Sequence, residues 1–126
     1  MKHKIWVIGE LLLVFILLSM PGNQFPKTDG WWVSLPIDKF IHVLLFGSLA
    51  YSILNYFKQA PNAFLKTIRA KAIALLFCVI YGIAMEFYQK YFVPSRGFEV
   101  NDMLADAFGA MIALPLFNKI QLRKQL

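Results

Sequence analysis

Apolar residues fill four long runs of this chain, and short polar stretches separate them. The runs are Ile5–Met20, Ile37–Phe57, Ala72–Phe92 and Asn101–Phe117. Stretches of about 17–25 predominantly apolar residues are long enough to cross the hydrocarbon core of a bilayer as helices. The pattern therefore predicts an all-α fold, an integral membrane bundle of four transmembrane helices, in a single domain over residues 1–126.

Local signals mark where two of these helices begin. Pro36 precedes the second run and suits the first turn of a helix, and Asp38 places a negative charge near the positive helix end. Asn101 opens the fourth run and belongs to a residue type that is favoured at the N-cap. We therefore expect the second helix to start at Ile37 and the fourth to be capped by Asn101.

The composition favours a membrane protein over a soluble one. The chain is 59% hydrophobic with a mean hydropathy of +0.57, whereas soluble domains are about 45–50% apolar. Its one cysteine, Cys78, lies inside the third run and has no partner for an internal disulfide. We expect Cys78 to be a small buried side chain in the helix packing.

The distribution of basic residues predicts the orientation in the membrane. The net charge is +6, and nine of the thirteen Lys and Arg residues lie in the N-terminus, the 58–71 stretch and the C-terminus. Because basic residues favour the cytoplasmic side, we expect a multi-pass protein of the cell membrane with both termini in the cytoplasm. These residues flank apolar runs, so we expect them to meet membrane lipids and expect no nucleic-acid partner.

The first run has a second interpretation. Lys2 and Lys4 followed by a short apolar core are also typical of a cleaved signal peptide. Glu10 inside the core, and the lack of an A-x-A-like site after Met20, argue against cleavage. We therefore expect the segment to remain as the first helix, with Glu10 making a structural packing contact.

Three pairs of polar residues interrupt the apolar runs at helical spacing. The pairs are Asp38 with His42, Glu86 with Gln89, and Asp102 with Asp106. Residues three or four apart share a helix face, and ionisable residues inside a membrane are costly unless they face protein or water. At about 1.5 Å per residue, His42, Glu86 and Asp106 all lie about 8–9 Å below the outer boundary. We therefore expect one outward-facing polar site, with Arg96 in the turn above it.

These residue types suit acid/base chemistry or ligand binding. An imidazole beside carboxylates in a low-dielectric site can relay a proton, so the candidate catalytic residues are His42, Glu86 and Asp106. A guanidinium can hold a phosphate or a carboxylate. The candidate binding residues are Asp38, Gln89, Arg96 and Asp102. The same residue types could hold a divalent metal ion, although their spacing matches no diagnostic metal motif, and no other cofactor is indicated.

Several of these residues also have a structural interpretation. Asp38 and Asp102 are first-turn acids, which the helix dipole stabilises by itself. His42 could form a hydrogen bond between helices. Arg96 could pair with Glu99 or Asp102 and shape the turn. The sequence leaves these alternatives open.

Three stretches around these residues form an ordered set of motifs. They are DKFIHVLLFGSLAYS at 38–52, YGIAMEFYQKYFVPSR at 81–96 and FEVNDMLADAFGA at 98–110. The motifs D-K-x-x-H, E-x-x-Q, P-x-R and D-x-x-x-[ND]-x-x-G, in this order, resemble the VanZ-like membrane protein family over roughly residues 38–113. The family more often has Asn where this chain has Asp106. The resemblance implies a small multi-span protein of the bacterial envelope.

Two functions fit this resemblance. The family takes its name from a member associated with resistance to the glycopeptide teicoplanin, so one hypothesis is an envelope protein that binds a lipid-linked cell-wall precursor or a glycopeptide. The alternative is an intramembrane acid/base or metal-assisted enzyme acting on a lipid-linked phosphate or ester, which requires catalytic groups within hydrogen-bonding distance. Proton-coupled transport is less consistent, because Glu10 is the one acid in the cytoplasmic half. The oligomeric state stays open.

Overall fold

The structure is a computed structural model, and it describes residues 2–22, 37–59 and 68–123. Four α-helices make up nearly all of this part of the chain: α1 (Lys2–Leu18), α2 (Ile37–Lys58), α3 (Ile68–Phe92) and α4 (Val100–Arg123). No strand occurs among the described residues. The predicted all-α fold is confirmed.

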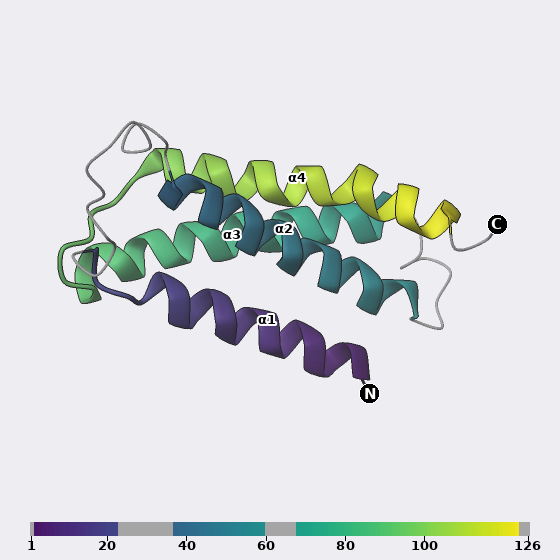
Figure 1. The fold of residues 1–126 in the computed structure, drawn as a ribbon, viewed down its shortest axis with the longest axis horizontal. Coiled ribbons are helices and arrows are strands. Elements are labelled where there is room, and N and C mark those ends of the chain that lie inside the picture. Colours follow the sequence, from purple (N-terminus) through teal and green to yellow (C-terminus); the bar gives the residue numbers. More distant parts are fainter. Residues whose placement is uncertain (1, 23–36, 60–67, 124–126) are drawn as a thin grey trace.

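The helices run alternately up and down in one bundle (Figure 1). α1 begins and α4 ends at one end of the bundle, while α2 begins at the other end beside the turn between α3 and α4. The contact between α2 and α4 is the most extensive, and α1 packs on α2 and, more lightly, on α3. α2 has the most extensive contacts with the rest of the bundle and therefore lies at its centre.

Glycine residues at their contact let α2 and α4 approach each other closely. A Cβ atom added to Gly109 would collide with the backbone carbonyl of Val43, and one added to Gly47 would lie 3.2 Å from the carbonyl oxygen of Gly109. Such contacts are typical of membrane helices, which associate through small residues at their interfaces. The close approach sets the depth at which polar residues of α2 and α4 meet.

Buried apolar side chains fill the space between the helices. Phe46, Leu49 and Cys78 are fully buried in one cluster with Val14 of α1. The sulfur of Cys78 is a free thiol, so the expectation of a small buried side chain is confirmed. Many large apolar residues instead face outward, Leu44 and Phe92 among them at 71% and 75% exposure. Outward apolar side chains on every helix are consistent with a lipid surrounding.

Three helices are long and apolar enough to cross a membrane: α2, α3 and α4, with 22, 25 and 24 residues. α1 has 17 residues, which corresponds to about 26 Å and the short end of the range for a membrane span. Three of the four predicted spans of the described chain thus have the length and composition of membrane-spanning helices, and the number of spans stays a prediction. The cytoplasmic position of the termini stays a prediction.

Two helices extend beyond the predicted apolar runs. α3 begins at Ile68, four residues before the predicted Ala72, and α4 continues to Arg123 past the predicted Phe117. The added turns carry basic residues, whose long side chains can reach the headgroup region while the helix continues. The predicted ends differ from the observed ones because the prediction ended each helix with its apolar run, whereas the backbone hydrogen bonds of a helix continue through charged residues.

The predicted cap of the fourth helix is wrong. α4 already includes Val100, so Asn101 lies inside the first turn and is exposed. The carbonyl of Glu99 accepts the hydrogen bonds of the Asp102 and Met103 amides, which makes Glu99 the residue before the helix. α2 begins at Ile37 as predicted, while Pro36 lies outside the described residues.

Candidate functional site

Polar side chains from three helices meet at the end of the bundle where α2 begins and α3 turns into α4. His42 of α2, Glu86 of α3, and Asp102 and Asp106 of α4 are all at most 2% exposed. Buried ionisable groups are rare unless they pair with one another. The predicted convergence of three helix faces is therefore present in the structure.

His42 and Asp106 form the innermost contact of this site. Nδ1 of His42 lies 2.8 Å from Oδ1 of Asp106, and Nε2 lies 3.7 Å from Oδ2 of Asp102. With its proton on Nδ1, the imidazole donates to Asp106 and directs the lone pair of Nε2 toward Asp102. By accepting the hydrogen bond from Nδ1, the Asp106 carboxylate thus selects the tautomer in which Nε2 can accept a proton or bind a cation.

Asp38 is held by Arg96 from the turn between α3 and α4. Nη1 of Arg96 donates to both carboxylate oxygens of Asp38 at 3.1 Å. The turn is shaped by Ser95, which adopts a positive φ of 62°, a conformation that is uncommon outside glycine. The suggested pairing of Arg96 with Glu99 or Asp102 stays a prediction, and a second cation contacts both of those acids.

That cation is Lys39, which the sequence did not single out. Its Nζ atom donates to Oε2 of Glu99 at 3.0 Å and to Oδ1 of Asp102 at 2.8 Å. Lys39 precedes His42 by three residues and therefore shares its helix face. The spacing of three residues between Lys39 and His42 is part of the D-K-x-x-H motif. However, a lysine near the start of a helix is more often solvated than paired with a buried acid.

Glu86 meets the start of α4. One oxygen, Oε2, accepts the backbone N–H of Glu99 at 2.8 Å, which places a negative charge at the positive end of the helix. Its side chain is fully buried at the same end of the bundle as those of His42 and Asp106. Glu86 therefore joins the site and also stabilises the turn that carries Arg96.

Gln89 contacts a different part of the bundle. Its Nε2 atom donates to the backbone carbonyl of Leu18 at 3.0 Å. Leu18 is the last residue of α1, whose final carbonyls lack partners within the helix. The predicted binding residue Gln89 thus attaches α1 to α3 and has no described hydrogen bond to the other site residues.

Three buried atoms in the site have no hydrogen-bond partner among the described residues: Nε2 of His42, Oε1 of Glu86 and Oδ2 of Asp106. Unsatisfied polar atoms are costly in a buried position. Ligand atoms of Asp38, His42 and Asp102 also lie within 4.8 Å of one another. The ligand atoms of Asp38, His42 and Asp102 therefore lie close enough together to share one cation.

With every carboxylate ionised, the formal charge of this site is negative. Five carboxylates (Asp38, Glu86, Glu99, Asp102 and Asp106) surround two fixed cations, and Lys39 and Arg96 each contact carboxylates of this set. A phosphate or carboxylate ligand would meet this excess of negative charge. The expected binding of an anion by Arg96 stays a prediction, and a bound cation would favour it by reducing this negative charge.

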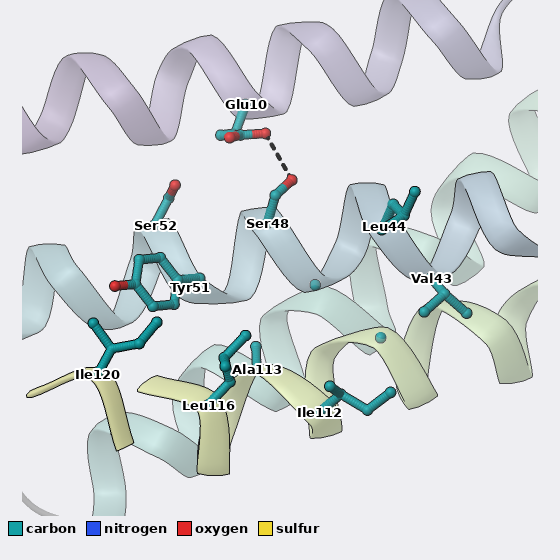
Figure 2. Close-up of a pocket in the computed structure, with 12 residues that line it drawn as sticks. Glu10, Val43, Leu44, Ser48, Tyr51, Ser52, Ile112, Ala113, Leu116 and Ile120 are labelled. Atoms are coloured by element: carbon teal, nitrogen blue, oxygen red, sulfur yellow. Dashed lines mark hydrogen bonds between the residues drawn. The ribbon is translucent and has the colours of Figure 1, made fainter. Parts of the chain in front are cut away.

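Glu10 takes part in a separate polar contact outside this site. Its Oε2 atom accepts a hydrogen bond from the hydroxyl of Ser48 at 3.0 Å (Figure 2). The pair borders a groove of about 540 Å³ over α2, whose other wall is formed by α4 residues such as Ile112 and Leu116. The structure thus gives Glu10 the packing contact that was expected, a link between α1 and α2.

Comparison with known proteins places this arrangement in a family. No curated protein and no solved structure matches the chain. The family model described as VanZ/LLP1 matches residues 4–121, and so extends the resemblance of residues 38–113 to all four helices. With the membrane-length helices and the motif residues gathered at one end of the bundle, the chain belongs to the VanZ/LLP1 family and is a VanZ-like membrane protein.

Proposed function

We propose that this protein is a membrane enzyme that hydrolyses a lipid-linked phosphate or ester at the polar end of its helix bundle. The observation that carries the proposal is the contact of 2.8 Å between Nδ1 of His42 and Oδ1 of Asp106. An acid/base enzyme needs an imidazole held by a second group, with its other nitrogen open to the reaction.

The position of the site supports a substrate with a polar head and an apolar tail. His42 follows the first residue of α2 by five positions, a depth of about 8 Å along the helix axis. A lipid that enters the bundle from the headgroup region would bring its phosphate or ester to this end of the site first, with its chains in the hydrocarbon core. Asp38, with a 35% exposed side chain, connects the buried residues to the surface at this end.

The burial of the site favours a catalytic function over ligand binding without reaction. His42 is fully buried and Asp106 is 1% exposed, so their interaction takes place away from bulk water, where electrostatic effects are strong. In the proposed reaction, water adds to the phosphorus or carbonyl carbon, the bond to the leaving oxygen breaks, and that oxygen takes up a proton. His42 assists the attack, and Asp106 keeps its imidazole oriented.

The test is hydrolysis by the purified chain in lipid nanodiscs, with polyprenyl phosphates, polyprenyl diphosphates and glycerolipid esters as substrates. We expect release of inorganic phosphate or of the free acid, a loss of at least 100-fold in His42→Gln, and no change in Glu10→Gln. Glu10 is the matched control because it is an intramembrane acid outside the site. If no substrate turns over, or if His42→Gln retains full activity, the proposal is wrong.

A second candidate is an envelope protein that binds a lipid-linked cell-wall precursor or a glycopeptide without reaction. It is favoured by the structural contacts of Glu86, Lys39 and Arg96, each of which already stabilises the bundle end. Growth of a susceptible bacterium in teicoplanin distinguishes the two functions. Protection that survives at least one of His42→Gln and Glu86→Gln supports binding, whereas protection lost with both supports catalysis.

A further inference from the structure

We propose that Asp38, His42 and Asp102 form a binding site for one divalent transition-metal ion. The proposal rests on the proposed function and changes the role of His42 in it: Nε2 would hold the ion in place of accepting a proton, and water bound to the ion would supply the nucleophile. It also names the cation that would let a negatively charged site accept a phosphate. Its three ligand atoms come from α2 and α4 and lie within 4.8 Å of one another. Two of the residues, His42 and Asp102, are buried to 0% and 2% exposure.

The strongest indication is the free nitrogen of His42. Nε2 has no hydrogen-bond partner among the described residues, although its side chain is fully buried. It faces Oδ2 of Asp102 at 3.7 Å. When Nδ1 carries the proton, both of these atoms present lone pairs, and either a shared cation or a second proton on the ring relieves their repulsion.

The spacing fits a metal ion. An ion about 2.1 Å from Nε2 of His42 and from Oδ2 of Asp102 bridges their separation of 3.7 Å with an angle of about 120° at the metal. Asp38, the third ligand, lies at the edge of the site, and both of its oxygens retain lone pairs beside Arg96. One imidazole and two carboxylates without a thiolate suit ions such as Mn²⁺ and Zn²⁺, and three protein ligands leave a position for water.

Neighbouring residues are placed to orient each ligand. Asp106 accepts from the second nitrogen of His42, Lys39 holds the other oxygen of Asp102, and Arg96 holds Asp38. Ligating histidines commonly donate their other ring N–H to a carboxylate or carbonyl. The two positive charges of the ion would also reduce the negative excess of the five carboxylates.

The experiment measures binding of Mn²⁺ to the purified chain, without substrate, by electron paramagnetic resonance. The protein carries no polyhistidine tag, so its histidines are His3 and His42. We expect one Mn²⁺ per chain and at least tenfold weaker binding in His42→Gln and in Asp102→Asn. His3→Gln is the matched control, because His3 contacts Gln59 at the opposite end of the bundle, and its affinity should change less than twofold.

A second measurement needs no variant of the site. The electron spin-echo spectrum of bound Mn²⁺ should show modulation from a directly coordinated ¹⁴N nucleus in both wild type and His3→Gln. Absence of this modulation, substoichiometric binding, or equal affinity in folded His42→Gln overturns the metal site. Because neither measurement requires turnover, a chain that binds Mn²⁺ but hydrolyses nothing contradicts the proposed enzyme and leaves the metal site standing.

Discussion

Gly82 of α3 lies directly against the carboxylate of Asp106 on α4. A Cβ atom at Gly82 would stand 2.5 Å from Oδ2 and 3.1 Å from Cβ of Asp106. Gly82 is four residues before Glu86 and therefore on the same face of α3. The missing side chain makes the space in which Asp106 can turn toward His42.

The first prediction concerns this space. Gly82→Ala should push the Asp106 carboxylate away from Nδ1 of His42 and lower Mn²⁺ affinity and any hydrolysis by about 10–100-fold, as expected when a group that orients a metal-binding histidine is disturbed. Both are measured on protein that elutes as wild type in size exclusion. Gly9→Ala on α1 is the control, because nothing lies within 4 Å of its Cβ position. Equal losses in both variants would contradict a specific role for Gly82.

The second prediction separates the charge of Asp106 from its hydrogen bond. An asparagine oxygen can accept the Nδ1–H of His42 as the carboxylate does, so Asp106→Asn should retain most of the metal binding. Asp106→Leu offers no acceptor and should lose at least tenfold in Mn²⁺ affinity. A loss in Asp106→Asn as large as in Asp106→Leu would mean that the negative charge itself is required.

The third prediction concerns the two acids that share Lys39. Lys39→Met should lower the free energy of unfolding by about 1.5–3 kcal/mol, because it leaves the buried Asp102 carboxylate without this partner. Glu99→Gln should cost less than about 1 kcal/mol, since Glu99 is 54% exposed in its pair with Lys39 and exposed pairs contribute little. Equilibrium unfolding in mixed micelles measures both. Similar costs for the two variants would show that burial does not decide the strength of this contact.

The fourth prediction concerns the packing of α2 on α4. Gly109→Ala places a methyl group into the backbone carbonyl of Val43, so the helices must separate, at a cost of about 1–3 kcal/mol in the free energy of unfolding. Gly97→Ala in the turn is the control, since its Cβ position is open. We expect thermal unfolding to shift in the first variant and to stay within error in the second. Unchanged unfolding of Gly109→Ala would contradict the tight contact.

Much of this bundle could be predicted from the sequence because helix formation in a membrane is a local property. An apolar run of sufficient length must satisfy its own backbone hydrogen bonds as a helix, and the runs around Phe46, Cys78 and Phe108 all became helices. Polar residues at intervals of three or four marked the faces on which His42 and Glu86 lie. Their common depth followed from counting residues along each helix.

The tertiary structure decided which polar groups meet. Gln89 shares a helix face with Glu86, yet it donates to Leu18, because α1 packs beside that turn of α3. Lys39, which sequence reasoning passed over, reaches Asp102 because the contact between α2 and α4 brings them within 2.8 Å. Sequence spacing fixes the position of a side chain on its own helix, whereas the distance to a side chain on another helix depends on how closely and at what rotation the two helices pack.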